Sequence, residues 1–152
     1  MRKEMLKGIT MAVLTITLAL ATAVVSANAQ SSNRVAAAIP FNFGVGGQTM
    51  AAGDYILGSI SSDGEGLLVR SKDSGKSVVR LTNSIQPSVK NTNARLVFHR
   101  YGQRYFLAEV WGAEGSTGRK LTESREERAI RREFGKLAQN SYETVELSAK
   151  LR

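Results

Sequence analysis

Residues 94–111 read ARLVFHRYGQRYFLAEVW, and this stretch decides the fold that the sequence predicts. Two runs rich in β-branched and aromatic residues flank Tyr101-Gly102-Gln103-Arg104, which has the composition of a tight turn. The segment is therefore expected to form a β-hairpin. Apolar side chains occur on both faces of each run. This is typical of central strands covered by a second sheet on one side and by a helix or loop on the other.

The length of the hairpin loop decides which side chains share a face, because a shift of one residue exchanges the two faces. A loop of two or four residues groups Val97, His99 and Tyr101 with Phe106, Ala108 and Val110. A loop of three residues groups Leu96, Phe98 and Arg100 with the same apolar set. The sequence leaves both registers open.

The residues before the hairpin carry the pattern of further short strands. Ile39, Phe41, Phe43 and Val45 alternate with other residues, as in one strand with a single buried face. Pro40 has no N–H to donate, so this strand is expected at a sheet edge or with a bulge at its start. Turn residues, glycine above all, recur at short intervals as far as residue 112. The pattern predicts an all-β fold, an antiparallel sandwich or partly open barrel of about six to eight strands.

The residues after the hairpin predict one helix. Ser124 and Glu127 have the spacing of a capping box, in which side chains bond two N–H groups at a helix start. Apolar residues then recur at helical spacing from Ile130, and Glu127 with Arg131 makes a favourable pair four residues apart. We expect an amphipathic helix over residues 124–137 that covers one face of the hairpin.

The beginning of the chain predicts export. Three basic residues precede an apolar run from Ile9 to Val25, and Ala27-Asn28-Ala29 has the small residues of a signal-peptidase site. We expect a signal peptide over residues 1–29 with cleavage between Ala29 and Gln30, and a periplasmic or extracellular protein. The alternative is an uncleaved membrane anchor. The remaining chain is interpreted as a polar leader over residues 30–34 and a single β-rich domain over residues 35–152, with a last strand over residues 143–151.

Composition closes off several kinds of chemistry. The chain has no cysteine, which excludes disulfides, a thiol nucleophile and thiolate metal sites. His99 is the only histidine, so a site with two histidine ligands is impossible. We therefore expect no metal and no cofactor. Hydrolysis through His99 would also need an orienting acid and a serine within hydrogen-bond reach, and the sequence shows no such set.

The formal net charge of +8 falls to +6 when a signal segment of net charge +2 is removed. A basic balance favours acidic partners, although it also serves solubility without any partner. Because an exported protein meets few nucleic acids, an envelope protein, an acidic glycan or an anionic lipid is the expected partner, and contact with a membrane is expected only through an uncleaved signal segment.

Aromatic and basic side chains gather on the hairpin, and Tyr, Trp and Arg dominate binding hot spots. The candidate binding surface consists of Arg95, His99, Arg100, Tyr101, Arg104, Tyr105 and Trp111. The alternative interpretation is that the rings belong to the core and the arginines to its rim.

Four segments resemble a family of small exported bacterial proteins of uncharacterised function. They are Ile39 to Phe43 with Val45-Gly46, Ala52 to Tyr55, Leu96 to Gly102, and Tyr105 to Leu107. The match would cover most of residues 35–134, and the hairpin heptad Leu-Val-Phe-His-Arg-Tyr-Gly is its most specific part. Asn42 stands where the family has an acid, so no carboxylate role is carried to this position. The resemblance implies export and an all-β body, and it assigns no residue a role.

These observations predict an exported, non-catalytic binding or scaffolding domain of the cell envelope. Two alternatives remain open at this point. One is a small hydrolase that uses His99. The other is a protein that binds an anionic lipid or glycan through the basic hairpin and helix.

Overall fold

The computed structural model describes residues 34–60, 65–87, 93–112, 117–137 and 142–152. Within these ranges the fold is all-β with one helix, α2 (Arg125–Leu137), as the sequence predicts. Eleven strands are present, more than the six to eight expected. They are β1 (Val35–Ile39), β2 (Phe43–Val45), β3 (Gln48–Met50), β4 (Gly53–Ser59), β5 (Gly66–Ser71), β6 (Ser77–Ile85), β7 (Arg95–Tyr101), β8 (Arg104–Trp111), β9 (Gly118–Leu121), β10 (Glu143–Ser148) and β11 (Lys150–Leu151).

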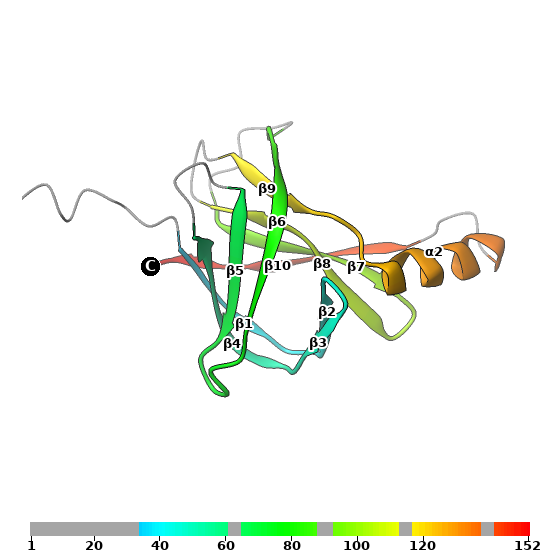
Figure 1. Cartoon of the computed structure of the whole chain (residues 1–152), viewed down its shortest axis with the longest axis horizontal. Helices are drawn as coiled ribbons and strands as arrows, with labels where there is room; N and C mark the ends of the chain where they lie inside the picture. Colours follow the sequence, from blue (N-terminus) through cyan, green and yellow to red (C-terminus); the bar gives the residue numbers. More distant parts are fainter. Residues whose placement is uncertain (1–33, 61–64, 88–92, 113–116, 138–141) are drawn as a thin grey trace, which may run out of the picture. The chain divides into compact units, whose positions relative to one another are not determined.

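The strands form one sheet in the order β10-β7-β8-β9-β6-β5-β4-β1-β11. Figure 1 labels these strands except β11. β2 lies off this path, antiparallel to β3 and parallel to β8. Ala149 alone separates β10 from β11, and its N–H donates to the carbonyl oxygen of Ala94. One segment of chain therefore pairs with β7 at one end of the path and with β1 at the other, and the sheet closes on itself.

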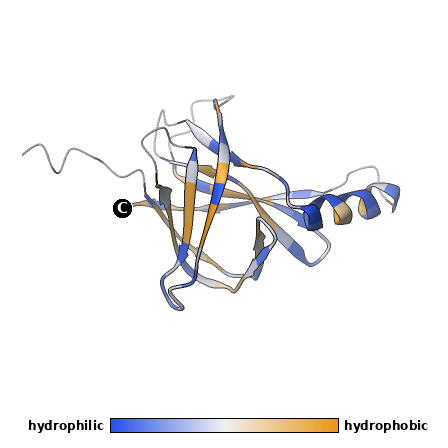
Figure 2. Cartoon of the chain, viewed as in Figure 1, coloured by the Kyte–Doolittle hydropathy of each residue, from blue (hydrophilic) through white to orange (hydrophobic). Residues whose placement is uncertain are grey.

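Closure creates a core from the inward side chains of nearly every strand. Phe43, Tyr55, Leu57, Val69 and Phe98 are each at most 2% exposed and belong to the same cluster. Figure 2 shows hydrophobic and hydrophilic residues alternating along the strands, as period-two patterning requires. A second, smaller cluster lies between the outer face of the hairpin and α2 and contains Tyr101, Phe106, Ile130 and Phe134. The helix thus covers the hairpin, as expected.

The expected single strand from Ile39 to Val45 is wrong. The chain leaves the ladder at Pro40 and re-enters it at Phe43, so that β1 pairs with β4 and β11 while β2 pairs with β3 and β8. Pro40 cannot donate to a ladder, which explains the break. Asn42 Oδ1 accepts the N–H of Ala52 at 2.9 Å, so an amide oxygen holds the two sides of this corner together.

The hairpin has a two-residue loop, since Tyr101 is opposite Arg104. Gly102 has a φ of 61° and occupies the first loop position, where a type II′ turn requires a positive φ. Near the turn, His99 and Tyr101 share a face with Phe106, as a two-residue loop predicts. A bulge between Val97 and Phe98 then shifts the register, and beyond it Leu96 opposes Val110 on the core side. Each of the two expected groupings is therefore right for one half of the hairpin.

Residues 1–33 lie outside the described residues. The signal peptide, its cleavage between Ala29 and Gln30 and most of the leader stay predictions. Among the described residues, α2 is neither long nor apolar enough to cross a membrane.

Candidate functional site

The polar chemistry of the domain is concentrated where the start of α2 meets β7. Ser124 is 7% exposed and caps the helix, because its Oγ accepts the N–H of Glu127 at 3.0 Å. This half of the predicted capping box is confirmed. The Glu127 carboxylate contacts His99 on β7, where its Oε1 lies 2.8 Å from the ring Nδ1. The cap and this contact together fix the first turn of the helix to the sheet.

His99 is enclosed at this junction. It is 9% exposed, and Glu127 is 4% exposed, so the pair is largely withdrawn from water. The ring of Tyr142 covers the imidazole with a centroid distance of 4.1 Å. An ionised carboxylate only accepts hydrogen bonds, so Nδ1 carries the shared proton when Glu127 is charged.

Tyr101 lies two residues from His99 on the same strand and is 1% exposed. Its hydroxyl oxygen is buried and has no hydrogen-bond partner among the described residues. Burial raises the pKa of Tyr101 strongly, and the negative charges of Glu127 and Glu123 raise it further. A buried hydroxyl without a partner is rare in folded proteins, because losing its water costs free energy that no bond returns.

Glu123 completes the group. One ligand atom from each of His99, Glu123 and Glu127 lies within 4.8 Å of the other two. Arg131 Nη1 approaches Glu123 Oε1 at 3.3 Å. The expected ion pair between Glu127 and Arg131 is therefore wrong. Glu127 contacts His99 instead, and Arg131 pairs with Glu123.

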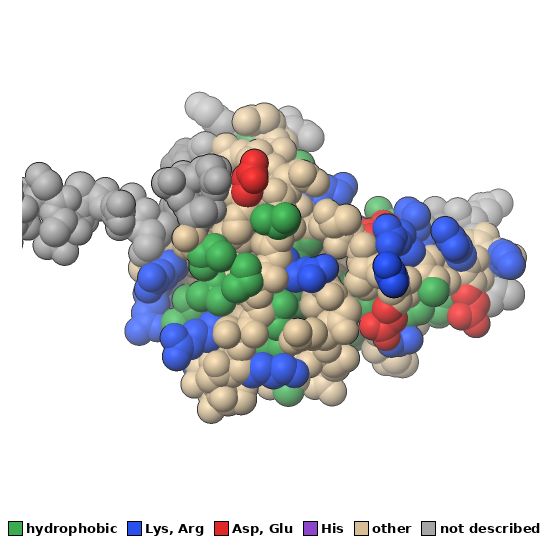
Figure 3. Space-filling model, in the orientation of Figure 1, with side chains coloured by type: hydrophobic (Ala, Val, Ile, Leu, Met, Phe, Trp, Pro, Cys, Tyr) green, Lys and Arg blue, Asp and Glu red, His purple; other side chains and the backbone are tan. Residues whose placement is uncertain are grey.

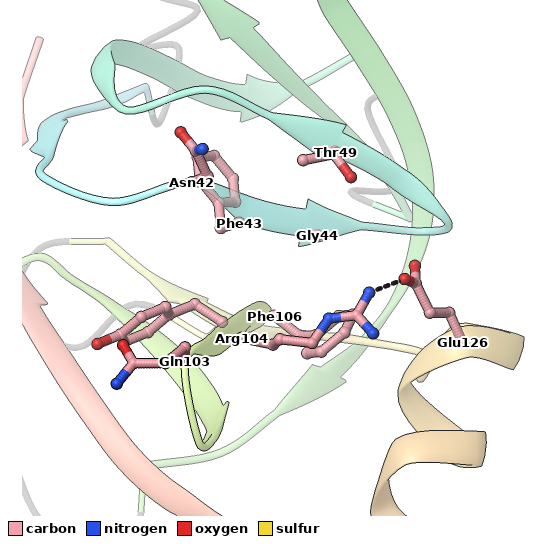
Figure 4. A pocket seen from close by; sticks show the side chains of 9 residues that line it. Asn42, Phe43, Gly44, Thr49, Gln103, Arg104, Phe106 and Glu126 are labelled. Carbon is pink, nitrogen blue, oxygen red and sulfur yellow. Dashed lines mark hydrogen bonds and ion pairs between the residues drawn. The ribbon is translucent and has the colours of Figure 1, made fainter.

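A cavity of about 140 Å³ opens beside this junction (Figure 4). Asn42 and Thr49 face Gln103 and Arg104 of the hairpin turn across it. Arg104 makes an ion pair with Glu126 at the start of α2. The cavity is smaller than the roughly 300–1,000 Å³ of pockets that hold drug-sized ligands.

A larger cleft of about 460 Å³ lies on the other side of Glu126. Its basic side chains are Arg80 from β6 and Arg125 and Arg128 from α2, against the carboxylates of Glu123 and Glu126. The basic helix face and a basic strand residue thus line one hollow, which the sequence pattern did not indicate.

The expected hairpin surface is divided by the fold. Tyr101, His99 and Trp111 are buried, at 1%, 9% and 7% exposure, so they are not part of an open surface. This corrects the prediction for these three residues, because α2 and the neighbouring strands cover both faces of the hairpin. Tyr105 is half-buried and stacks on Phe41 with a centroid distance of 3.8 Å.

The hairpin arginines are at the rim, and acidic side chains accompany them. Arg95 lies over the ring of Trp111 and 3.4 Å from Glu146 of β10. Arg100 binds Glu143 of β10 at 3.3 Å, and Arg104 binds Glu126. The alternative interpretation, with rings in the core and arginines at its edge, describes most of the seven residues. Only Arg104 among them is exposed.

An apolar strip on the outer face of the sheet was missed. Val79 and Leu81 of β6 are 51% and 74% exposed, and Leu68 of β5 lies opposite Val79. Ile60 is 54% exposed, and its N–H donates to the carbonyl oxygen of Gly66. Gly66 lies opposite Leu81 on the neighbouring strand. Figure 3 shows hydrophobic side chains gathered over β5 and β6, with basic side chains beside them. We call Ile60, Leu68, Val79 and Leu81 the outer strip.

Comparison with known proteins found no match to a family model, to a curated protein or to a solved structure. The resemblance to the family of small exported proteins stays a prediction.

Proposed function

We propose that this chain is an exported, non-catalytic binding domain of the cell envelope, and that the outer strip is the surface through which it docks on a protein partner. The observation that carries the proposal is the exposure of adjacent large apolar side chains on a sheet whose core is already complete. Contiguous exposed apolar patches on soluble domains mark interaction surfaces.

The surroundings of the outer strip favour an acidic protein partner. Gly58 lies opposite Leu68, and the side chain of Arg34 lies against Gly58. Arg70 is exposed two residues along β5 from Leu68, on the same face. A partner with an apolar centre and carboxylates at its rim would match both features, and basic charge would also speed the encounter.

The test compares recovery of partners from envelope extract by the wild-type chain and by a Val79→Thr/Leu81→Thr variant. Threonine is β-branched and therefore suits a strand, and it removes apolar surface at both positions. Burial of each side chain is worth about 1.5–3 kcal/mol, so we expect at least a tenfold loss in affinity for the partner. Leu151→Thr is the matched control, because Leu151 is 52% exposed and is not part of the outer strip.

The proposal fails if the double variant recovers the same partner in the same amount as wild type. It also fails if Leu151→Thr loses the partner equally, since the effect would then not depend on the strip. Urea unfolding of all three chains establishes that the variants are folded at the concentration used.

A second candidate function is binding of an anionic lipid or glycan. The cleft with Arg80, Arg125 and Arg128 favours it, although Glu123 and Glu126 offset part of the charge. Sedimentation with anionic vesicles tests the lipid, and an acidic polysaccharide column tests the glycan. An Arg125→Gln/Arg128→Gln variant should lose either interaction, while Arg132→Gln, a change at an exposed arginine of the same helix, should retain it.

The hydrolase alternative gains one element from the structure, the contact between His99 and Glu127. Two observations favour a structural role for this pair. The imidazole is covered by Tyr142, and Ser124 is engaged as the helix cap.

Export itself is tested by mass spectrometry of the secreted species. A chain beginning at Gln30 is expected, and a membrane-bound chain retaining Met1 would contradict the proposal.

A further inference from the structure

His99, Glu123 and Glu127 together offer metal-ligand atoms of a kind that the composition of the chain does not exclude. A two-histidine site is impossible in this chain, but one imidazole and two carboxylates also suit divalent first-row metals such as Zn²⁺. The three come from two elements: His99 from β7, and Glu123 and Glu127 from the entry and first turn of α2.

The spacing of the donor atoms fits a small ion. Ligands about 2.0–2.1 Å from a tetrahedral centre lie roughly 3.3–3.5 Å from one another. His99 Nδ1 and Glu127 Oε1 are 2.8 Å apart. One ligand atom from each of the three residues lies within 4.8 Å of the other two. A small opening of the first contact and a small approach of Glu123 would therefore suffice. A metal ion would take the place of the proton that lies between Nδ1 and Glu127, and a neutral imidazole would then carry its proton on Nε2.

The Tyr101 hydroxyl provides a second and independent indication. It is buried, has no hydrogen-bond partner among the described residues, and is subject to the charges of Glu127 and Glu123. Tyr142 contacts the rings of both His99 and Tyr101, with centroid distances of 4.1 and 5.8 Å. Tyr101 also belongs to the cluster beneath α2 rather than to the main core, so its side chain lies on the same side of β7 as the group. A metal-bound water or carboxylate oxygen would give this hydroxyl the acceptor that it lacks.

Arg131 is the basic side chain that pairs with Glu123. Its Nη1 lies 3.3 Å from Glu123 Oε1, and its side chain is 43% exposed, so it is partly hydrated. The cleft that Glu123 lines also contains Arg80, Arg125 and Arg128, which oppose a cation as well. An arginine that holds one oxygen of a ligating carboxylate also orients the other, which is the usual role of groups behind metal ligands.

We propose that His99, Glu123 and Glu127 bind one divalent transition-metal ion of the Zn²⁺ class, and that Tyr101 supports the site through its hydroxyl. The ion joins the start of α2 to β7. Its role is structural, because His99, Glu127 and Tyr101 are buried and only Glu123 reaches the neighbouring cleft.

The experiment uses the untagged chain, stripped with a chelator and titrated with Zn²⁺ by calorimetry. We expect one bound ion per chain and a higher melting temperature with the metal. Glu123→Gln should weaken binding at least tenfold with little effect on the metal-free fold, since Glu123 lies at the edge of the group. Tyr101→Phe should weaken binding by about ten- to a hundredfold, as expected for a group behind the ligands.

Glu126→Gln is the matched control, because Glu126 is on the same helix turn and binds Arg104 instead. Titrations with Mg²⁺ and Ca²⁺ test the metal class. The proposal is overturned if the wild-type chain does not bind Zn²⁺, if Glu123→Gln and Glu126→Gln bind it equally, or if Ca²⁺ or Mg²⁺ binds as tightly as Zn²⁺.

Discussion

Tyr101→Phe should stabilise the metal-free protein, although it removes a polar atom from a residue of the second core cluster. The hydroxyl is buried and has no partner among the described residues, so folding removes its water without supplying a bond. An unsatisfied buried group of this kind costs about 1–3 kcal/mol. Removal of the oxygen loses a few weak packing contacts, each about 0.1–0.2 kcal/mol. We expect a net gain of about 1 kcal/mol in the free energy of unfolding.

Tyr55→Phe is the matched comparison and should have the opposite sign. Tyr55 is 2% exposed, and its hydroxyl donates to the carbonyl oxygen of Ala51 at 2.6 Å. The substitution removes the same atom and with it this hydrogen bond, at a cost of about 1 kcal/mol. The free energies of unfolding of the two variants should therefore lie on opposite sides of the wild-type value and differ from each other by about 2 kcal/mol.

The assay is urea unfolding followed by tryptophan fluorescence, in the presence of a chelator so that no metal contributes. A gain of about 1 kcal/mol corresponds to roughly 4 °C in melting temperature for a domain of this size. If Tyr101→Phe is destabilised as much as Tyr55→Phe, the Tyr101 hydroxyl has a hydrogen-bond partner in solution. That result would show that the Tyr101 hydroxyl is not an unsatisfied buried group.

Two further predictions concern the same elements. Burial raises the pKa of both Tyr101 and Tyr55, so above pH of about 10 the unfolded chain releases tyrosine protons that the folded chain retains. The stability that these two tyrosines contribute is complete below that pH and should decrease above it. Urea midpoints measured at several alkaline pH values test this. If the decrease were no smaller in Tyr101→Phe than in wild type, the prediction would be contradicted. Ser124→Ala should cost about 1 kcal/mol, because the N–H of Glu127 loses its acceptor; unfolding in urea measures the loss, and an unchanged midpoint would show that the cap does not stabilise α2.

The parts of the fold that depend on local chemistry could be predicted from the sequence. The turn at Gly102 requires a residue that tolerates positive φ, and the cap at Ser124 requires only residues three positions apart. The hairpin and α2 follow from such patterns. The number of strands was underestimated for several reasons. Pro40 divides one apparent strand into two that pair with different partners. The short strands β3 and β9 were not expected, and Ala149 divides the last strand into β10 and β11.

The candidate site was less predictable because its contacts join distant positions. His99 and Glu127 are 28 residues apart, and nothing in their spacing marks them as partners. Glu127 carried the signal of a helix cap, and Glu123 and Tyr142 carried no signal at all. The bulge after Val97 also decided which hairpin residues are buried, and bulges leave little trace in a single sequence. For that reason the aromatic residues that resembled a binding surface are mostly core.

Closure of the sheet by β10 and β11 also has a consequence for synthesis. Val35 pairs with Leu151, so the sheet cannot close until residues more than a hundred positions apart are both available. A chain emerging from the ribosome therefore has unpaired edges on β1 and β7 until β10 and β11 arrive. Open edges recruit other strands, and long-range pairing is slow. During that interval the edges of β1 and β7 are open to chaperones. They are covered only when the last strands have been synthesised.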